Sequence, residues 1–254
     1  MNGFEFRRSL EERLRAVAGE DAFWEAGHLL TYLEKNPGAD LDKLLRRRCE
    51  GEPLQYVLGE WEFFGLPFVT DRRALIPRPD TELLCEIALS ILKGGERVLD
   101  LCCGSGCIGI ALAKHRAIEL VSADISLDAL SLTGENASRN KVTLKTVQSD
   151  LFSGIEGTFD LIVSNPPYLS GPEMRHLERS LSFEPGIALD GGEDGLDFYR
   201  RIRCEYPSFL KKKGALLLEI GASQEKAVCE LFEGAQCRYD YGNRPRAIIV
   251  RQYD

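Results

Sequence analysis

The sequence contains no apolar run of the length that a membrane span requires, and residues 1–20 carry too many charges for a signal peptide. It contains no C-x-x-C pair, and its eight cysteines lack the regular spacing of a disulfide framework. Only three histidines are present. These absences predict a cytoplasmic protein with free thiols and with neither a membrane segment nor a bound metal.

The sequence also lacks an excess of basic residues. Lys and Arg number 32 against 40 Asp and Glu, which gives a formal net charge of -8. Because nucleic-acid binding rests largely on basic surface, this balance argues against a protein whose main task is to hold a polyanion. The net charge does not exclude a local basic patch. The run Arg46-Arg47-Arg48 is interpreted as a solvated helix face, with contact to RNA or to an acidic partner as the alternative.

What the chain does contain is typical of a globular protein with one large domain and one small domain, since it has 254 residues of which 44% are hydrophobic. The amino-terminal part has apolar residues at helical spacing in three segments, followed by an aromatic hairpin at 60–71 and an extended linker at 75–79. The helices are expected at 4–18, 21–35 and 40–49. The predicted domains are 1–59 (helical), 60–79 (hairpin linker) and 80–254 (the large domain).

After a helix expected at 81–92, the chain alternates short apolar runs with helical patterns, which indicates an α/β domain with a mainly parallel sheet covered on both faces. We expect a doubly wound sheet of seven strands. The strands are predicted at 97–101, 118–123, 142–148, 159–164, 214–220, 235–240 and 246–251. The helices between them are predicted at 107–115, 126–139, 196–211 and 223–233.

The first motif is the tetrapeptide Asn165-Pro166-Pro167-Tyr168, which follows the apolar strand at 159–164. Prolines cannot continue a buried strand, so the motif should lie just past a strand end, where open α/β sheets bind ligands. The Asn165 side-chain oxygen and the Pro166 carbonyl can each accept one N–H of a planar NH₂ group, and the Tyr168 ring can cover its π face. The motif therefore predicts a cradle for an amide or an amine; taken alone, it also fits a proline-rich turn.

The second motif is a glycine loop, Gly104-x-Gly106-x-x-Gly109, which follows the strand at 97–101. It formally matches the dinucleotide fingerprint, so the loop alone does not separate NAD from other adenosine cofactors. Asp100, which precedes the loop, would repel a pyrophosphate but would attract the sulfonium and ammonium groups of S-adenosyl-L-methionine. The charge therefore favours the sulfonium cofactor.

Two more acids end the next two strands. Asp124 can accept both ribose hydroxyls, and Asp150 can accept from the adenine amino group, with Leu151 and Ile108 on the two faces of the ring. Each acid alone is equally well a surface residue or a helix cap, but the three together predict an adenosine site that avoids phosphate. The neighbouring Cys102, Cys103 and Cys107 are interpreted as packing residues because no histidine nearby completes a metal or nucleophile site.

With both motifs in place, the chain resembles the peptide chain release factor glutamine methyltransferases, the HemK-type family. The resemblance is carried by GEPLQYVLG (51–59), LIPRPDTE (75–82), DLCCGSG (100–106), QSDLF (148–152), SNPPY (164–168) and FEPGIALDGGEDGLDFYR (183–200), and it covers about four fifths of the chain. It implies an S-adenosylmethionine-dependent methyltransferase fold. It also implies a substrate-recognition role for the small helical domain.

The resemblance implies methyl transfer to the side-chain amide nitrogen of the glutamine in the Gly-Gly-Gln motif of class-one release factors. Asn165, Pro166 and Tyr168 are the implied catalytic residues, and with Pro167 they hold the glutamine. Cys102 stands where many members have glycine, and we expect a negative φ there because a thiol-bearing residue is poorly tolerated otherwise. The implied cofactor-binding residues are Asp100, Cys102, Cys103, Gly104, Ser105, Gly106, Asp124, Asp150, Leu151 and Asn165.

Two other classes of function remain open from the sequence. The same cradle serves methyltransferases that act on adenine amines in nucleic acid, and another protein glutamine is a further possible acceptor. A nicotinamide-dependent oxidoreductase or a nucleotide-binding module without catalysis would also use the glycine loop. The acidic balance favours the release factor as substrate. We expect a monomer with no stable nucleic-acid binding.

Overall fold

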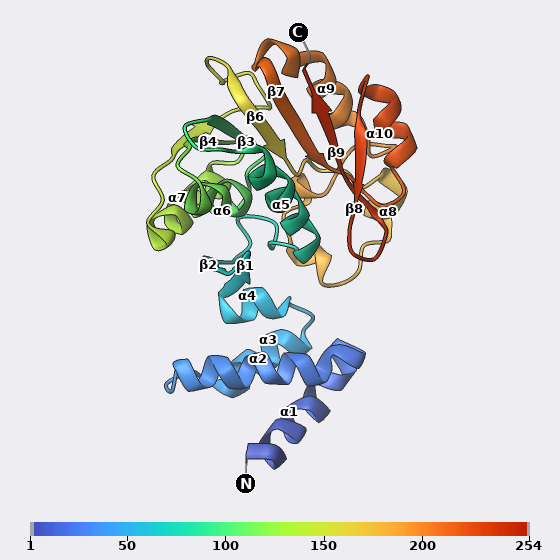
Figure 1. Ribbon diagram of the computed structural model, residues 1–254. Coiled ribbons are helices and arrows are strands. Elements are labelled where there is room, and N and C mark those ends of the chain that lie inside the picture. Colours follow the sequence, from blue (N-terminus) through green and yellow to red (C-terminus); the bar gives the residue numbers. More distant parts are fainter. Residues whose placement is uncertain (1–2, 253–254) are drawn as a thin grey trace.

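The computed structural model describes residues 3–252, so Met1, Asn2, Tyr253 and Asp254, which belong to the first and last predicted domains, lie outside the described residues. Figure 1 shows two parts. Helices of the amino-terminal segment lie at one end, and a sheet flanked by helices forms the larger part, with a short hairpin between them. The division of the chain at 59 and 79 stays a proposal.

The three helices predicted at the amino terminus are present, and a fourth follows them. They are α1 (Gly3–Ala18), α2 (Ala22–Lys35), α3 (Leu41–Cys49) and α4 (Leu54–Leu58). Their apolar faces meet in a core of their own, which includes Leu10, Leu14, Leu29 and Leu45. The sequence analysis missed α4 because a helix of five residues is too short to show a periodic pattern.

The prediction that Arg46-Arg47-Arg48 forms a solvated helix face is wrong for two of the three residues. The buried guanidinium of Arg48 pairs with the buried carboxylate of Glu25 at 2.8 Å. Arg47 donates to Glu52 at 2.7 and 2.9 Å and to the carbonyls that end α4. A guanidinium can make several hydrogen bonds in a fixed fork, so these arginines hold α3 against α2 and α4 instead of facing solvent.

The hairpin is confirmed and packs on the sheet-containing part. Strands β1 (Glu60–Phe63) and β2 (Leu66–Val69) pair antiparallel. The rings of Phe63 and Phe68 are buried in the core beneath the sheet, and the Val69 amide donates to the Asn136 side chain at 2.7 Å. The hairpin therefore fixes where the linker that follows it crosses the sheet.

The seven-stranded, mainly parallel sheet is confirmed, with the order β5-β4-β3-β6-β7-β9-β8. Only β9 runs antiparallel to its neighbours. The order reverses between β3 and β6, which is where doubly wound sheets bind ligands. The strands are β3 (Arg97–Leu101), β4 (Glu119–Asp124), β5 (Lys145–Gln148), β6 (Phe159–Ser164), β7 (Leu210–Glu219), β8 (Gln236–Tyr239) and β9 (Pro245–Arg251).

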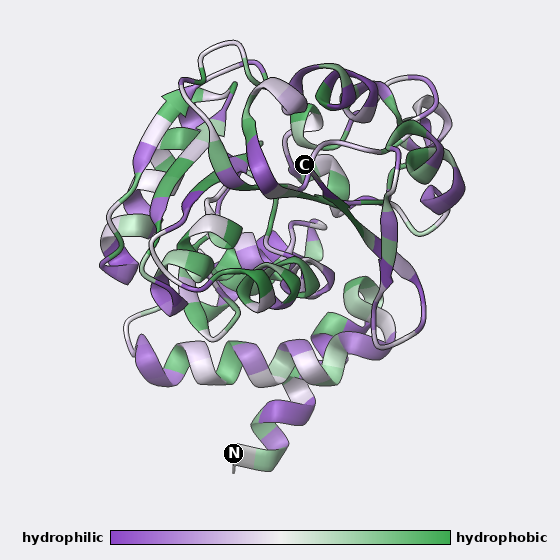
Figure 2. Cartoon of the chain, turned by 45° about the horizontal axis from the view of Figure 1, so that its top comes forward, coloured by the Kyte–Doolittle hydropathy of each residue, from purple (hydrophilic) through white to green (hydrophobic). Residues whose placement is uncertain are grey.

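Helices cover both faces of this sheet, and the strands alternate between two cores. On β6, Leu161 and Val163 pack against α5, α6 and α7, whereas Ile162 packs against α9 and α10. Figure 2 shows the resulting apolar centre of the sheet in green. The helices are α5 (Glu82–Ile91), α6 (Cys107–His115), α7 (Leu127–Asn140), α8 (Gly171–Arg175), α9 (Asp197–Glu205) and α10 (Glu225–Leu231), with 3-10 turns η1 (Gly19–Asp21), η2 (Pro79–Thr81), η3 (Leu181–Phe183), η4 (Gly186–Ala188) and η5 (Tyr206–Ser208).

Several boundaries differ from the predictions, including the start of β7, which lies four residues before the predicted 214, and two of them have a clear local reason. The helix expected at 196–211 ends at Glu205, because Pro207 lacks the N–H that a continuing helix needs, and β7 starts by Leu210. The strand expected at 142–148 starts at Lys145. The apolar residues Val142 and Leu144, predicted to begin this strand, instead follow the end of α7 and pack against the core. The Val142 amide donates to the Ala137 carbonyl in the last turn of that helix.

Candidate active site

The two motifs leave the sheet from neighbouring strands. Leu101, the last residue of β3, is in register with Ser164, the last residue of β6. The buried Ser164 hydroxyl donates to the Leu101 carbonyl at 2.6 Å. The glycine loop and the Asn165-Pro166-Pro167-Tyr168 segment therefore begin side by side at the switch point of the sheet.

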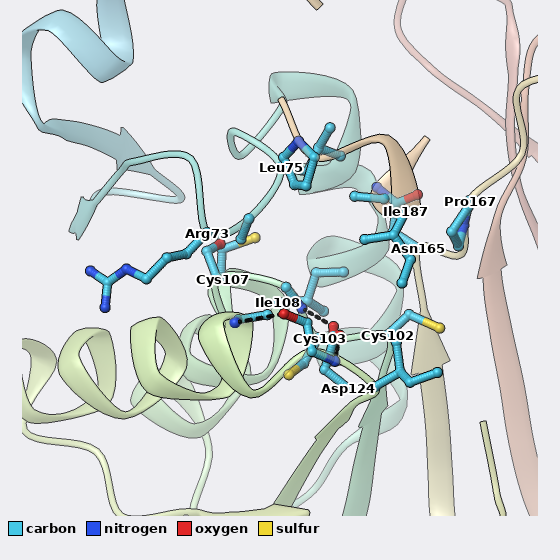
Figure 3. Close-up of a pocket in the computed structure, with 18 of the residues that line it drawn as sticks. Arg73, Leu75, Cys102, Cys103, Cys107, Ile108, Asp124, Asn165, Pro167 and Ile187 are labelled. Atoms are coloured by element: carbon cyan, nitrogen blue, oxygen red, sulfur yellow. Dashed lines mark hydrogen bonds between the residues drawn. The ribbon is translucent and has the colours of Figure 1, made fainter. Parts of the chain in front are cut away.

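A single cavity lies between the two loops, with an empty volume of about 1100 Å³ when its open part is included. Figure 3 shows Asn165, Pro167 and Ile187 on one side of it, with Cys102, Cys103 and Asp124 below and Leu75 above. This size suits a small-molecule ligand together with part of a second reactant. Of the predicted site residues, those that line the cavity are Cys102, Cys103, Gly104, Ser105, Asp124, Asp150, Leu151, Asn165 and Pro167.

Asp124 shapes the glycine loop as well as facing the cavity. One carboxylate oxygen accepts the Gly104 amide and the other accepts the Ser126 amide, each at 2.9 Å. Burial raises the pKa of Asp124, and the hydrogen bonds from the backbone oppose that rise. Each carboxylate oxygen keeps a further lone pair, so Asp124 can still accept hydroxyl groups from a bound ribose.

Asp100 and Gly106 lie behind the loop and do not line the cavity. Asp100 is fully buried, and one of its oxygens accepts the Gly109 amide at 3.0 Å while the other has no partner. Burial raises the pKa of Asp100 to about 8. Gly106 has a φ of +77°, and a Cβ there would lie 2.8 Å from Thr133. Gly106 therefore acts on the shape of the loop, and Asp100 acts on both its shape and its electrostatic potential.

The expectation of a negative φ at Cys102 is wrong, because its φ is +56°. This is the left-handed region that glycine adopts freely and other residues adopt at a cost of roughly 1–2 kcal/mol. Cys102 nevertheless lines the cavity. Burial raises the pKa of the Cys102 and Cys107 thiols to about 12, so both stay protonated at neutral pH, as packing residues rather than nucleophiles would.

The part of the cavity around Asp150 is lined by apolar side chains and by an ion pair. Leu151 and Ile108 are both buried and both line it. The carboxylate of Asp150 pairs with Arg201 on α9 at 2.8 Å. Sequence analysis missed Arg201 and its neighbour Phe198, which also line this part, because an amphipathic helix pattern does not distinguish residues that face a ligand from those that face solvent.

The four residues of the first motif divide into two pairs. Asn165 and Pro167 line the cavity, whereas Pro166 is buried and the Tyr168 ring packs against the core beside α9 and β7. Burial raises the pKa of the Tyr168 hydroxyl. The Tyr168 carbonyl accepts the Gln224 side-chain amide at 2.9 Å, so a residue from the loop after β7 holds the motif in place.

Two further segments line the cavity, and the sequence analysis did not single out their residues as site residues. The linker at 73–78 and the 3-10 turn η4 both contribute lining residues. The buried carboxylate of Glu184 joins them, since it accepts the Ile76 amide at 2.9 Å and pairs with Arg78. Residues 75–78 of the linker and all of η4 lie within stretches that carry the family resemblance, which was the available signal.

The described residues contain no cluster of His, Cys, Asp and Glu that could hold a metal ion, and no described helix is long and apolar enough to cross a membrane. The cavity does fit a cationic adenosine cofactor. The carboxyl groups of Asp124 and Asp100 are placed so that a nearby cation would favour their ionised forms, and the apolar walls suit an adenine ring. The fold and the site together define an S-adenosylmethionine-dependent methyltransferase.

Comparison with known proteins identifies the family. Residues 80–180 match the model of the methyltransferase small domain. A release factor glutamine methyltransferase from Koribacter versatilis is 40% identical over 241 residues, which span 90% of this chain and 86% of the relative. One from Geobacter sulfurreducens is 43% identical over 192 residues, or 74% of this chain and 68% of the relative. The chain belongs to the release factor glutamine methyltransferase family.

Solved structures with lower identity agree on the fold. A methyltransferase from Pyrococcus furiosus superimposes with a TM-score of 0.58 at 19% identity, over 76% of this chain and 91% of that chain. An E. cuniculi complex described as responsible for methylation of a translation termination factor superimposes with a TM-score of 0.52 at 22% identity, over 72% of this chain and 99% of that chain. At these identities the likeness concerns the fold alone.

Proposed function

We propose that this protein transfers a methyl group from S-adenosyl-L-methionine to the side-chain amide nitrogen of a glutamine in a class-one peptide chain release factor, namely the glutamine of the Gly-Gly-Gln motif. The relatives that establish the family are named release factor glutamine methyltransferases. The observation that carries the proposal is the shared cavity, because the glycine loop and Asn165 line the same space. A donor and an acceptor amide can therefore meet there.

The cofactor side of the cavity is assigned to the residues between β3 and α6 and to the next two strand ends. We assign the methionine part to Cys102–Ser105, the ribose to Asp124 and the adenine to Asp150 with Leu151, flanked by Ile108. Asp100 and Gly106 support the loop from behind. When bound, the cofactor supplies a methyl group on a positively charged sulfur.

The acceptor side is assigned to the first motif. Asn165 and the Pro166 carbonyl each accept one N–H of the substrate amide, and Pro167 forms part of the wall. An amide nitrogen is a weak nucleophile because its lone pair is delocalised, and accepting both N–H groups favours the state in which that lone pair localises. Since the Tyr168 ring packs into the core, we assign it the role of a support behind Pro167 and a barrier to water.

Orientation and electrostatics supply most of the acceleration in this proposal. The glycine loop and the motif start from paired strands, so the reacting atoms are held at a fixed separation by the sheet itself. Holding two reactants in line is worth up to about 7–11 kcal/mol when the geometry is good. No cysteine is needed as a nucleophile, because burial keeps the thiols at the loop protonated.

Other assignments follow from this function. We propose that residues 1–59 form the substrate-recognition domain, which their separate core supports. We propose further that the enzyme is a monomer that binds no nucleic acid stably, as the net charge of -8 favours. A substrate that acts in translation places the reaction in the cytoplasm.

Mass spectrometry of a release factor after incubation with the enzyme and S-adenosyl-L-methionine tests the function. We expect a gain of one methyl group, on the glutamine of Gly-Gly-Gln. A release factor with that glutamine replaced by alanine serves as the control and should gain none. Transfer of label to DNA or RNA in place of the release factor would instead establish the adenine-amine activity.

A further inference from the structure

One buried acid beside the acceptor site has no role in the assignments above. Glu219 is the last residue of β7, and its neighbour Leu218 is in register with Ser164 on β6. Its side chain thus lies next to the start of the Asn165 motif. It is only 3% exposed, and its Oε2 has no hydrogen-bond partner. A buried carboxyl with an unpaired oxygen is costly and requires an explanation.

Glu219 belongs to a small hydrogen-bonded cluster with Thr81 and Asn165. The side chains of both residues are close enough to its carboxyl group to lower its pKa by hydrogen bonding, against the larger effect of burial. The Asn165 Nδ2 also donates to the Thr81 Oγ1 at 3.4 Å. Thr81 and Asn165 both line the cavity, whereas Glu219 lies behind them. Glu219 can therefore reach a substrate only through these two neighbours.

The direction of these hydrogen bonds decides what Asn165 presents to the substrate. A threonine hydroxyl has one proton, so when Thr81 donates to an ionised Glu219 it can only accept from Asn165. The atom that Asn165 turns toward the cluster must then be Nδ2, which leaves Oδ1 free for the cavity. If Glu219 were protonated, it could donate to Thr81 and Thr81 could donate to Asn165, which would favour the opposite orientation of the amide.

We propose that Glu219 is a positioning residue, whose ionised carboxylate acts with Thr81 to fix the Asn165 amide with its oxygen toward the acceptor NH₂ group. This inference rests on the proposed function. An amide in the opposite orientation would place N–H groups against the N–H groups of the substrate, and the cradle would lose one of its two acceptors. Glu219 thus selects the working orientation without touching the substrate.

Exchange of the carboxylate for an amide of the same shape tests the proposal. Glu219→Gln should lower kcat on the release factor by roughly tenfold or more, because one transition-state hydrogen bond is misdirected. The KM for S-adenosyl-L-methionine should change less than about twofold, since Glu219 lies outside the cofactor side. Asp160→Asn makes the same exchange at the opposite end of β6, where Asp160 pairs with Lys211, and should leave kcat unchanged.

The pH profile gives a readout that a merely structural role would not move. Burial raises the pKa of Glu219 to about 7, so kcat of the unmodified enzyme should fall as the pH drops through that value. The profile of Glu219→Gln should lack this step. Asp80 raises the pKa of Glu219 and Arg246 lowers it, so both are kept in all variants. The other titratable groups near Glu219 are Tyr168, Tyr199, Cys85 and Cys107.

Thr81 provides a second test that does not alter the acid. Thr81→Val keeps the shape without the hydroxyl and should lose kcat as Glu219→Gln does. Thr81→Ser restores the hydroxyl and should recover most of the rate that valine loses. This pair keeps the proposal testable even where Glu219→Gln fails to fold, which thermal unfolding would reveal.

The outcomes separate this proposal from the proposed function. If the unmodified enzyme does not methylate the release factor, the proposed function is wrong. If it does, but Glu219→Gln or Thr81→Val keeps full kcat, the positioning role is overturned. A step near pH 7 that persists in Glu219→Gln would also overturn it, because another group would then be responsible.

Discussion

The two sides of the cavity are built in different ways. On the cofactor side, the polar contacts of the glycine loop are local: Asp124 holds the amides of Gly104 and Ser126, which lie 20 and 2 residues away along the chain. On the acceptor side, Asn165 contacts Thr81, which lies 84 residues away, and the carbonyl of Tyr168 is held by Gln224, 56 residues away. The glycine-loop part of the cofactor side is therefore set by one supersecondary unit. The acceptor side, like the Asp150–Arg201 pair at 51 residues' separation, depends on contacts across the domain.

The two sides also differ in electrostatics. The cofactor side holds two buried acids whose pKa values are raised by burial, Asp100 and Asp124. A positive charge brought close to these acids would lower their pKa values and favour their ionised forms. The ionised carboxylates would in turn attract a sulfonium ligand. In the proposed function, the acceptor side presents neutral oxygens, from Asn165 and the Pro166 carbonyl. Such oxygens suit an uncharged amide.

The largest effect should come from the acceptor side. Asn165→Ala removes one acceptor of the proposed cradle, and we expect turnover to fall at least about a hundredfold, a loss of roughly 2.7 kcal/mol of transition-state stabilisation. Cofactor binding should change little, because the alanine leaves the glycine loop intact. Single-turnover methylation of the release factor, with calorimetric titration of S-adenosylhomocysteine beside it, measures both quantities. A near-normal rate in this variant would show that the Asn165 side chain is not an acceptor for the substrate amide.

The opposite pattern should follow a change on the cofactor side. Asp124→Ala removes the ribose acceptor and releases the amides of Gly104 and Ser126, so we expect the cofactor affinity to fall by about 10–30-fold, or roughly 1.4–2 kcal/mol. At saturating cofactor, kcat should recover most of its value. Calorimetric titration measures the affinity. An unchanged Kd would contradict the ribose assignment and with it the separation of the two sides.

This difference explains how much could be predicted from the sequence. The glycine loop and the acids Asp124 and Asp150 follow directly from strand ends, so their positions could be read from apolar runs and glycine spacing. The Asn165 motif could be placed for the same reason. The sheet, the hairpin and the fold class were likewise predictable from alternation of apolar runs and helical patterns.

Features that depend on distant contacts could not be predicted. Nothing in the residues near Glu219 indicates that its carboxyl meets Thr81 and Asn165. The parallel pairing of β6 and β7 brings Asn165 to it, and the packing of α5 against these strands brings Thr81. The ion pair of Arg48 with Glu25 was hidden for the same reason, since three consecutive arginines look like a solvated face in the sequence. Predicting these contacts requires the tertiary packing, which local patterns do not contain.

A smaller effect tests how tightly the glycine loop is packed. A Cβ at Gly109 would lie 2.8 Å from an oxygen of Asp100 and 2.9 Å from Leu120. We expect Gly109→Ala to destabilise the fold by about 1–2 kcal/mol, since overpacking outweighs the gain in helix propensity. Gly134→Ala on α7, where a Cβ meets nothing within 4 Å, is the matched control and should stabilise by about 0.5–1 kcal/mol. Thermal unfolding of both variants measures the contrast. Equal shifts of the unfolding temperature in the two variants would show that a methyl group at Gly109 fits without overpacking.

The smallest effect concerns Cys102, whose φ of +56° is unusual for a residue with a side chain. Comparing two substitutions at this position isolates the backbone strain, because both remove the thiol. Cys102→Gly relieves the strain, which costs roughly 1–2 kcal/mol, but glycine also gains conformational freedom in the unfolded chain. We therefore expect Cys102→Gly to be more stable than Cys102→Ala by at most about 1 kcal/mol.

Cys103 supplies the control for this comparison, since it is the next residue of the loop and is absent from the residues with positive φ. There the order should reverse, with Cys103→Ala more stable than Cys103→Gly, because alanine restricts the unfolded chain without straining the folded one. Thermal unfolding of the four variants measures both differences. If alanine is better than glycine by the same amount at both positions, the positive φ of Cys102 carries no measurable strain, and it does not distinguish the cofactor side from the acceptor side.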